Sequence, residues 1–212
     1  MMEHMFLDRQ QAGKKLSGAL SKYKGKKALV LALPRGGVSA GFEIAKVLGC
    51  PLDTIVARKV GAPGNPEYAV GAIAPGGIIV LDEHVYGIEE VIKEETKEME
   101  RRIEKYKSGS YARGTKPDVV IVVDDGVATG KTAIAALAHA RAAYPSATLV
   151  FAAPVGAPDS LARIRKEADE VVVLEAPQEF MAVGEWYVSF PQLTDEEVVH
   201  MLEKAREYGT SC

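Results

Sequence analysis

The middle of the chain alternates between continuous apolar runs and amphipathic segments. The runs at 28–33 (ALVLAL) and 119–123 (VVIVV) contain no polar residue, which is typical of parallel strands buried on both faces. Further strands are predicted at 52–57, 148–152 and 171–174, and helices at 129–144 and 159–168. Strands that alternate with helices of this length pair in parallel through right-handed crossovers. The pattern therefore predicts an α/β fold, a doubly wound, Rossmann-like parallel sheet flanked by helices, with its core at about 26–174.

Two segments lie outside this alternating core. An amphipathic stretch at 8–23 predicts an opening helix. Residues 60–114 form an insertion between the second and third predicted core strands, which we expect to hold a mobile loop and a helix. It begins with a Pro- and Gly-rich stretch at 61–66, expected to be irregular, and continues with a hairpin outside the main sheet, with strands at 69–74 and 78–81. A charged helix follows, whose apolar stripe consists of Ile88, Ile92, Met99, Ile103 and Tyr106.

The tail at 175–212 breaks the alternation and is rich in aromatic residues and prolines. A capping box, Thr194-x-x-Glu197, predicts the start of a last helix within it. We expect the tail to form a small hood over the sheet, so that residues 1–212 make one domain with a core, an insertion and a hood.

Composition and charge narrow the classes of protein to consider. Of the 212 residues 47% are hydrophobic and 26% are charged, as in ordinary globular domains. The net charge of -3 offers no broad basic field, which argues against a nucleic-acid binder. Cys50 and Cys212 are the only cysteines, too few for a disulfide framework or a zinc site. The sequence shows neither a signal peptide nor a membrane-spanning run, so we expect no membrane partner and a cytoplasmic location.

The segment at 119–132 (VVIVVDDGVATGKT) carries the clearest chemical signal. An apolar strand delivers two adjacent carboxylates, Asp124 and Asp125, into a loop of small residues that opens a helix. In an open α/β sheet this position is the ligand crevice. Backbone N–H groups at a helix N-terminus suit a phosphate, and carboxylates accept hydrogen bonds from a ribose diol or hold a metal. The candidate phosphate loop comprises Gly126, Val127, Ala128, Thr129, Gly130, Lys131 and Thr132.

Two other interpretations of this segment exist. Gly130-Lys131-Thr132 resembles the end of a nucleoside-triphosphate P-loop, but the position five before Gly130 is Asp125 instead of glycine. The spacing therefore argues against a P-loop. Alternatively, the acidic pair could serve only to cap the helix, with small residues that permit close packing. The sequence alone leaves that structural interpretation open.

The same residues resemble the signature of the type I phosphoribosyltransferase family: an apolar strand, two acidic residues and a Thr-Gly-x-Thr or Thr-Gly-x-Ser ending. The stretch at 123–132 (VDDGVATGKT) fits that signature throughout. The resemblance spans about 28–174 and is greatest to an uncharacterised group with a Leu-Pro-Arg-Gly-Gly turn. It implies that Asp124 and Asp125 hold the ribose hydroxyls of phosphoribosyl pyrophosphate, and that the loop at 126–132 holds its 5′-phosphate.

The resemblance also implies a pyrophosphate site after the first strand. In the turn Leu33-Pro34-Arg35-Gly36-Gly37, Gly36 and Gly37 would let backbone amides approach the anion, and Arg35 could donate two hydrogen bonds to it. Family members have a non-proline cis peptide in this turn, which we expect between Pro34 and Arg35. The alternative is an ordinary strand–helix turn with a solvated arginine.

Two further basic residues, Arg58 and Lys59, follow the second predicted strand. They could reach the same pyrophosphate, or they could simply be solvated at the end of a strand.

The tail resembles a base-binding hood. The stretch at 177–184 (PQEFMAVG) is similar, with a one-residue offset, to the hood of purine-using members, where a phenylalanine stacks on the base. Phe180 is therefore the first candidate for base stacking and Trp186 the second, with packing of the tail as the alternative for both.

In hypoxanthine-guanine members an aspartate acts near the base at the position of Ala128, so the easiest general-base assignment is lost here.

The resemblance implies a transferase of nucleotide metabolism that depends on Mg²⁺. It would move the 5-phosphoribosyl group from phosphoribosyl pyrophosphate to a small nitrogenous base, with a purine-like base favoured. Asp124, Asp125, Arg35 and Lys59 would serve the reaction, and the two aspartates would bind Mg²⁺ directly or through water. A non-catalytic sensor and a sugar-phosphate hydrolase on the same fold stay open as alternatives. The acceptor, the general base, the pathway and the oligomeric state, a homo-oligomer included, are not decided by the sequence.

Overall fold

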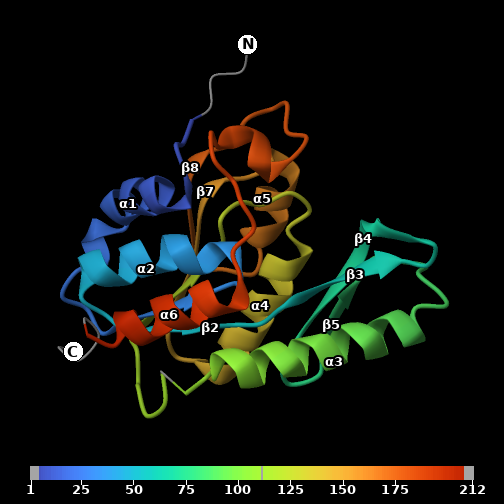
Figure 1. Ribbon diagram of the computed structural model, residues 1–212, viewed down its shortest axis with the longest axis horizontal. Helices are drawn as coiled ribbons and strands as arrows, with labels where there is room; N and C mark the ends of the chain where they lie inside the picture. The colour runs from blue at the N-terminus through green and yellow to red at the C-terminus, as the bar shows by residue number, and fades with distance from the viewer. Residues whose placement is uncertain (1–4, 111, 208–212) are drawn as a thin grey trace.

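The computed structural model describes residues 5–110 and 112–207, so Cys212 lies outside the described residues. Its centre is a five-stranded parallel sheet in the order β2-β1-β6-β7-β8 (Figure 1). The strands are β1 (Ala28–Ala32), β2 (Leu52–Thr54), β6 (Val119–Val123), β7 (Thr148–Val155) and β8 (Glu170–Glu175). The predicted doubly wound parallel sheet is confirmed. Since the strand order reverses between β1 and β6, the carboxyl ends of these two neighbours form the crevice where open α/β sheets bind ligands.

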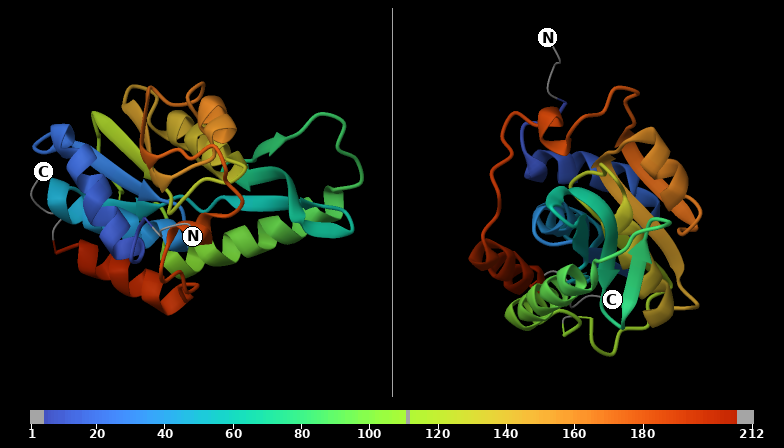
Figure 2. Two further views of the ribbon diagram at one scale, coloured as in Figure 1. Left: turned by 90° about the horizontal axis from the view of Figure 1, so that it is seen from above. Right: turned by 90° about the vertical axis from the view of Figure 1, so that its right-hand side faces the viewer.

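Helices cover both faces of the sheet (Figures 1 and 2). The helices are α1 (Arg9–Ala19), the short 3₁₀ turn η1 (Ser21–Tyr23), α2 (Gly36–Leu48), α4 (Lys131–Ala143), α5 (Pro158–Ile164) and α6 (Asp195–Ala205). One apolar cluster joins Val30 and Ile121 to α1, α2 and α6, and the other joins Leu29 and Val120 to α4 and α5. Because successive strand residues point to opposite faces, all five residues of β1 and of β6 are buried.

The insertion forms an arm that projects from the core, on the right of Figure 1 and of the left-hand view in Figure 2. The arm, residues 58–106, consists of an antiparallel sheet in the order β3-β4-β5 and one helix. Its elements are β3 (Arg58–Ala62), β4 (Asn65–Ala74), β5 (Ile78–Leu81) and α3 (Glu89–Tyr106). The predicted hairpin outside the main sheet and the charged helix after it are confirmed.

Two expectations about the start of the arm are wrong. The second core strand ends at Thr54 instead of 57, and Arg58 already begins β3. The stretch at 61–66 is not irregular either, because Ala62 pairs with Asn65 across a tight turn. The pairing shifts register on both sides of Gly61, where a Cβ atom would lie 2.6 Å from the Pro66 carbonyl oxygen. Glycine and the shifted register let the hairpin accommodate a proline that has no N–H to donate.

The tail returns to the core along α1 and α2. Phe6 pairs with Tyr187 next to the 3₁₀ turn η2 (Val183–Trp186), and α6 packs against α2 and α3. The predicted capping box is present, with hydrogen bonds in both directions between Thr194 and Glu197. Two parts of the tail reach the ligand crevice: Val183 lines the pocket at the N-terminus of α4, and Asp195 at the start of α6 faces Arg35. Among the described residues, no helix combines the length and apolarity needed to cross a membrane.

Candidate active site

The loop between β6 and α4 encloses a small pocket of about 170 Å³. The pocket lies at the N-terminus of α4, where the first backbone N–H groups have no intrahelical partner. It is lined by Asp124, Gly126, Val127, Ala128, Thr129, Gly130, Thr132, Ala133 and Val183. Gly130 is the N-cap residue with a φ of 74°, a left-handed conformation that glycine adopts readily. The geometry suits a phosphate group held by backbone amides.

Two side chains of helix α5 hold this loop through its backbone carbonyl oxygens. Ser160 Oγ donates to the carbonyl oxygen of Ala128 at 2.6 Å, and Arg163 donates to that of Thr129 at 3.0 Å. Trans peptide geometry then turns the N–H groups of Thr129 and Gly130 away from α5. Ser160 and Arg163 were not predicted as site residues, because nothing in the local pattern links them to a loop some thirty residues earlier.

Lys131 does not line the pocket, although it belongs to the predicted loop. Its ammonium group is buried, forms an ion pair with Asp82 and donates to the carbonyl oxygen of Ala69 at 2.9 Å. Both partners belong to the arm, so Lys131 fastens α4 to the arm's base. Only its backbone N–H remains in place for a phosphate.

The two aspartates after β6 lie in different electrostatic surroundings. Asp125 Oδ2 accepts a hydrogen bond of 2.6 Å from Arg9 Nε, whereas Asp124 Oδ1 accepts the backbone N–H of Asp125 at 2.9 Å. Burial, and then the negative charge of Asp125, raise the pKa of Asp124 well above its ordinary value. A metal cation or the two hydroxyl groups of a ribose diol, placed here, would stabilise the ionised form of Asp124.

The same donor set fits magnesium. Mg²⁺ takes carboxylate oxygens and usually completes its shell with water and substrate phosphates. Asp124 and Asp125 supply such oxygens, one of which is engaged by Arg9. Within residues 5–110 and 112–207 no group of three or more His, Cys, Asp or Glu side chains is placed to hold a metal. Water and substrate oxygens would complete the shell of an ion bound by the two aspartates.

The turn after β1 packs directly against the aspartate pair. The peptide bond between Pro34 and Arg35 is cis, as expected. A Cβ atom at Gly36 would lie 1.8 Å from Asp125 Oδ2, and one at Gly37 would lie 2.7 Å from a backbone carbonyl oxygen of β6. Only residues without side chains fit in these places. The structure therefore brings the candidate pyrophosphate turn and the candidate ribose carboxylates together.

Arg35 faces the first turn of α6. Its Nη1 lies 3.8 Å from Asp195 Oδ1, an ion pair beyond hydrogen-bond range. Asp195 also accepts hydrogen bonds from Tyr106 Oη at 2.5 Å and from Arg101 Nη1 at 3.0 Å. Burial alone would raise the pKa of Asp195, but the hydrogen bonds from Tyr106 and Arg101 outweigh it and leave that pKa below its ordinary value. Asp195 thus links the pyrophosphate turn to the arm.

We expect Asp195→Asn to lower the free energy of unfolding at pH 7 by about 1–2 kcal/mol, because charged hydrogen bonds lose their carboxylate. The pKa of Asp195 is lowered in the folded state, so its charge stabilises the fold above the ordinary pKa of about 4. That contribution disappears as the pH falls through the folded-state value. Urea titrations should therefore show that the two proteins differ less in their free energy of unfolding at the lowest pH at which both fold than they do at pH 7. Glu203→Gln, at an exposed position of the same helix, is the control, and an equal loss at both pH values would refute this role of Asp195.

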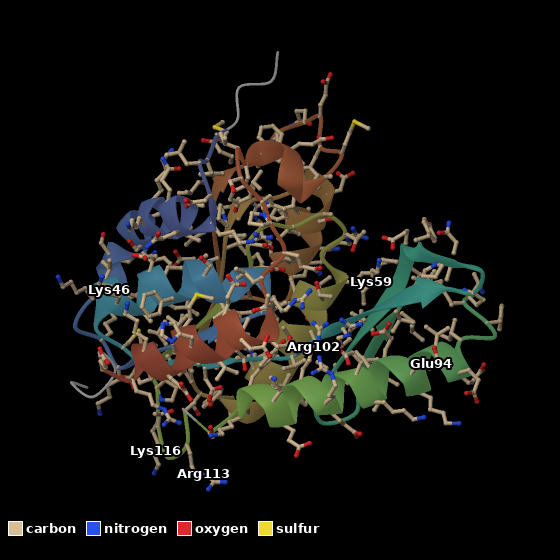
Figure 3. All side chains as sticks on the ribbon, in the orientation of Figure 1. Lys46, Lys59, Glu94, Arg102, Arg113 and Lys116 are labelled. Carbon is tan, nitrogen blue, oxygen red and sulfur yellow. The ribbon has the colours of Figure 1, made fainter. Side chains whose placement is uncertain are left out.

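Arg58 and Lys59 are tied to acidic residues of the arm. Arg58 contacts Glu95 through Nε at 2.7 Å and Nη2 at 2.6 Å. Lys59 Nζ lies 3.4 Å from Glu67 in an exposed pair, and Figure 3 shows Lys59 where the arm meets the core. An exposed pair contributes little free energy, so Lys59 can exchange Glu67 for an anion more easily than Arg58 can leave Glu95.

The hood segment contacts the phosphate loop through Val183. A Cβ atom at Gly126 would lie 2.3 Å from Val183 Cγ1. Phe180 and Trp186 stack on each other, with ring centroids 6.3 Å apart and an interplanar angle of 17°. The indole Nε1 of Trp186 is buried, and no described residue accepts a hydrogen bond from it. The hood thus lies beside the candidate phosphate site, and its two predicted aromatic residues stack on each other and pack, partly buried, against a small apolar cluster that includes Phe6 and Tyr187.

Comparisons with known proteins add independent information. A family model described as "Phosphoribosyl transferase domain" matches residues 5–187. Two proteins of Mycobacterium tuberculosis, "Putative phosphoribosyl transferase MT0597" of strain CDC 1551 / Oshkosh and "Putative phosphoribosyl transferase Rv0571c" of strain H37Rv, are each 42% identical to this chain over 209 residues. The match covers 95% of this chain and 47% of each relative, so the chain spans about half the length of these curated relatives.

Solved structures share the fold. The crystal structure of TT1426 from Thermus thermophilus superposes with a TM-score of 0.74 and 39% identity, over 96% of this chain and 99% of that one. AQ2163 from Aquifex aeolicus superposes with a TM-score of 0.50 at 14% identity, over 79% of this chain and 74% of that one. The second likeness concerns the fold alone.

Proposed function

The chain belongs to the phosphoribosyl transferase family, and from that premise we propose that it moves the 5-phosphoribosyl group of phosphoribosyl pyrophosphate to a nitrogenous base. One observation carries the proposal: the glycine turn at Gly36-Gly37 and the Asp124-Asp125 pair meet at the carboxyl ends of the neighbouring strands β1 and β6. The phosphate-sized pocket opens beside them. These three parts match the pyrophosphate, the ribose diol and the 5-phosphate of the donor.

Each part of the site then binds one part of the donor. The N–H groups of the loop at 126–132 bind the 5-phosphate, and Asp124 and Asp125 accept hydrogen bonds from the ribose hydroxyls. The amides of Gly36 and Gly37 and the guanidinium of Arg35 bind the pyrophosphate. Mg²⁺, when bound by the two aspartates directly or through water, would neutralise charge on the pyrophosphate and make it a better leaving group.

The reaction breaks the bond between ribose C1 and a pyrophosphate oxygen and forms a bond between C1 and a base nitrogen. Pyrophosphate leaves with the bonding electron pair, and the proton of the base nitrogen passes to the departing pyrophosphate or to water. The sugar develops oxocarbenium character on the way, which the carboxylates of Asp124 and Asp125 favour. The residues contribute mainly by positioning and charge. Ala128 replaces the aspartate of hypoxanthine-guanine members, and we assign no protein residue as the base.

The hood is the candidate acceptor site, and its resemblance to purine-using members favours a purine-like base. We expect Phe180→Ala to raise the KM for the base about fivefold or more, because stacking on an aromatic ring is worth roughly 1–3 kcal/mol per base. The KM for phosphoribosyl pyrophosphate should hardly change. Initial rates with each substrate varied in turn measure the difference, with Met181→Ala at an exposed neighbouring position as the control.

Trp186→Ala is the paired variant, since Phe180 and Trp186 stack on each other. A selective loss in Trp186→Ala alone would make Trp186 the platform. If neither aromatic substitution separates the two KM values, the hood does not bind the base, and the preference for a purine is wrong.

A sensor that binds the donor without turnover is the second candidate, because Ala128 leaves the site without an obvious base. A pyrophosphate assay with the protein, phosphoribosyl pyrophosphate, Mg²⁺ and a panel of nucleobases separates the functions. Release that requires a base supports transfer, and release without a base supports a hydrolase. Saturable binding without any release supports the sensor and contradicts transfer.

A further inference from the structure

We infer that Arg9 is a positioning residue of this site, which fixes the Asp125 carboxylate in the ribose subsite and fastens the hood to it. The inference rests on the proposed function for the identity of the ligand. Arg9 lies in the first turn of α1, 116 residues before Asp125. Neither the apolar pattern nor the motif at 123–132 indicates a role for it.

Three contacts surround the Arg9 guanidinium. Its Nε donates to Asp125 Oδ2 at 2.6 Å, and its Nη1 donates to the carbonyl oxygen of Pro191 at 2.6 Å. Its central carbon lies 3.5 Å from the centroid of the Phe190 ring, a cation–π contact. Arg9 is only 8% exposed, so these contacts form largely out of water, where charge-assisted bonds and cation–π contacts are strongest.

Tyr187 supplies a second link between the hood and the aspartate pair. The Tyr187 hydroxyl donates to the carbonyl oxygen of Asp125 at 2.6 Å, and its ring lies 4.8 Å from that of Phe190. Asp125 is therefore held at its side chain by Arg9 and at its backbone by Tyr187. Because Arg9 also holds Phe190 and Pro191, one side chain connects the ribose carboxylate to the segment that carries the candidate base platform.

The pyrophosphate turn closes the remaining side of the Arg9–Asp125 pair. A Cβ atom at Gly36 would lie 1.8 Å from Asp125 Oδ2 and 2.8 Å from Arg9 Nε. The bond to Arg9 and the close packing of Gly36 both lie at Oδ2, so we expect Asp125 Oδ1 to accept the ribose hydroxyl. A carboxylate held in one orientation loses less freedom on binding a ligand. A lysine cannot donate in two fixed directions as a guanidinium does. Arg9→Lys should therefore hold the Asp125 carboxylate better than Arg9→Gln does, but less well than arginine.

The test compares Arg9→Gln and Arg9→Lys with a matched arginine elsewhere. Arg141 also bridges a carboxylate and a backbone carbonyl, donating to Asp169 at 2.8 Å and to Ala147 O at 3.2 Å. Calorimetric titration with phosphoribosyl pyrophosphate and Mg²⁺ should show affinity about tenfold lower for Arg9→Gln. Arg9→Lys should lose less, and Arg141→Gln should change affinity by less than about twofold. Equal losses in Arg9→Gln and Arg141→Gln would overturn the inference.

A double-mutant cycle shows whether Arg9 acts through Asp125. In an Asp125→Asn background, adding Arg9→Gln should lower the affinity by less than about twofold, because residues that act together are not additive. Full additivity would overturn the positioning role. If the unsubstituted protein does not bind phosphoribosyl pyrophosphate, the proposed function fails and the ribose part of this inference fails with it.

The link to the hood is tested without a ligand. Trp186 is the only tryptophan of the chain and lies in the hood, so its fluorescence reports on that segment alone. Arg9→Gln should make Trp186 clearly more accessible to acrylamide quenching, Arg9→Lys less so, and Arg141→Gln not at all. Unchanged quenching in folded Arg9→Gln and Arg9→Lys would overturn the fastening of the hood, whatever the titrations show.

Discussion

Replacing Asp124 and Asp125 together with asparagine will weaken the binding of phosphoribosyl pyrophosphate by more than tenfold. Each carboxylate accepts hydrogen bonds from ribose hydroxyls in the proposed complex, and a lost charged hydrogen bond typically amounts to roughly 1.5–3 kcal/mol. Calorimetric titration in the presence of Mg²⁺ measures the loss. Asp118→Asn is the control, because Asp118 is exposed and precedes the opposite end of β6.

The double variant should still fold. Burial and the charge of Asp125 raise the pKa of Asp124 in the folded protein, so the ionised side chain at neutral pH is unfavourable to folding. Neutral asparagine removes that penalty, which offsets part of the lost Arg9–Asp125 ion pair. Circular dichroism and a thermal midpoint establish that the fold is intact. Unchanged affinity in the folded double variant would refute the assignment of the ribose subsite.

Gly37→Ala will destabilise the fold by about 1–3 kcal/mol, the usual range for a group forced into packed space. The new Cβ atom would lie 2.7 Å from the carbonyl oxygen of Val123 and 3.1 Å from the Asp124 Cα atom. These are backbone atoms, which cannot rotate away, so α2 and the end of β6 must separate. For a chain of this size, each kcal/mol lowers the thermal midpoint by roughly 2–4 °C, which differential scanning calorimetry detects.

Gly18→Ala provides the matched comparison for this glycine. Gly18 lies within α1 and no atom lies within 4 Å of its added Cβ. Alanine favours a helix by up to about 1 kcal/mol over glycine, so this variant should be neutral or more stable. Equal midpoints for Gly37→Ala and Gly18→Ala would contradict close packing of α2 against the end of β6.

Local signals predicted the part of the chain that forms the centre of the site. Strand β6 coincides with the apolar run at 119–123, and α4 begins within two residues of the predicted start. The apolar run, the turn residues and the helix start all lie between positions 119 and 131, so periodicity and capping suffice to place them. The family resemblance implied that this loop and the turn at Gly36 and Gly37 serve one ligand, and the structure shows them side by side because β1 and β6 are adjacent where the strand order reverses.

The contacts that the sequence did not predict join residues that are far apart along the chain. The ammonium of Lys131 is paired with Asp82, 49 residues away, so its place in the loop did not reveal its partner. Arg58 begins a strand of the arm because β3 pairs with β4, and a pattern of prolines and glycines does not indicate such pairing. Arg9 and Asp195 lie in helices at opposite ends of the chain, and their partners Asp125 and Arg35 are far from them in sequence.

Transfer of the phosphoribosyl group to a base is most directly measured by mass spectrometry of the product. The protein is incubated with phosphoribosyl pyrophosphate, Mg²⁺ and one base at a time from a panel of purines and pyrimidines. We predict, with at least one base, a product whose mass is that of the base plus the 5-phosphoribosyl group less one hydrogen, formed in an amount equal to the released pyrophosphate. The product should disappear in the Asp124→Asn, Asp125→Asn variant. Binding of phosphoribosyl pyrophosphate without such a product for any base, or release of pyrophosphate without a base, would contradict the proposed transferase.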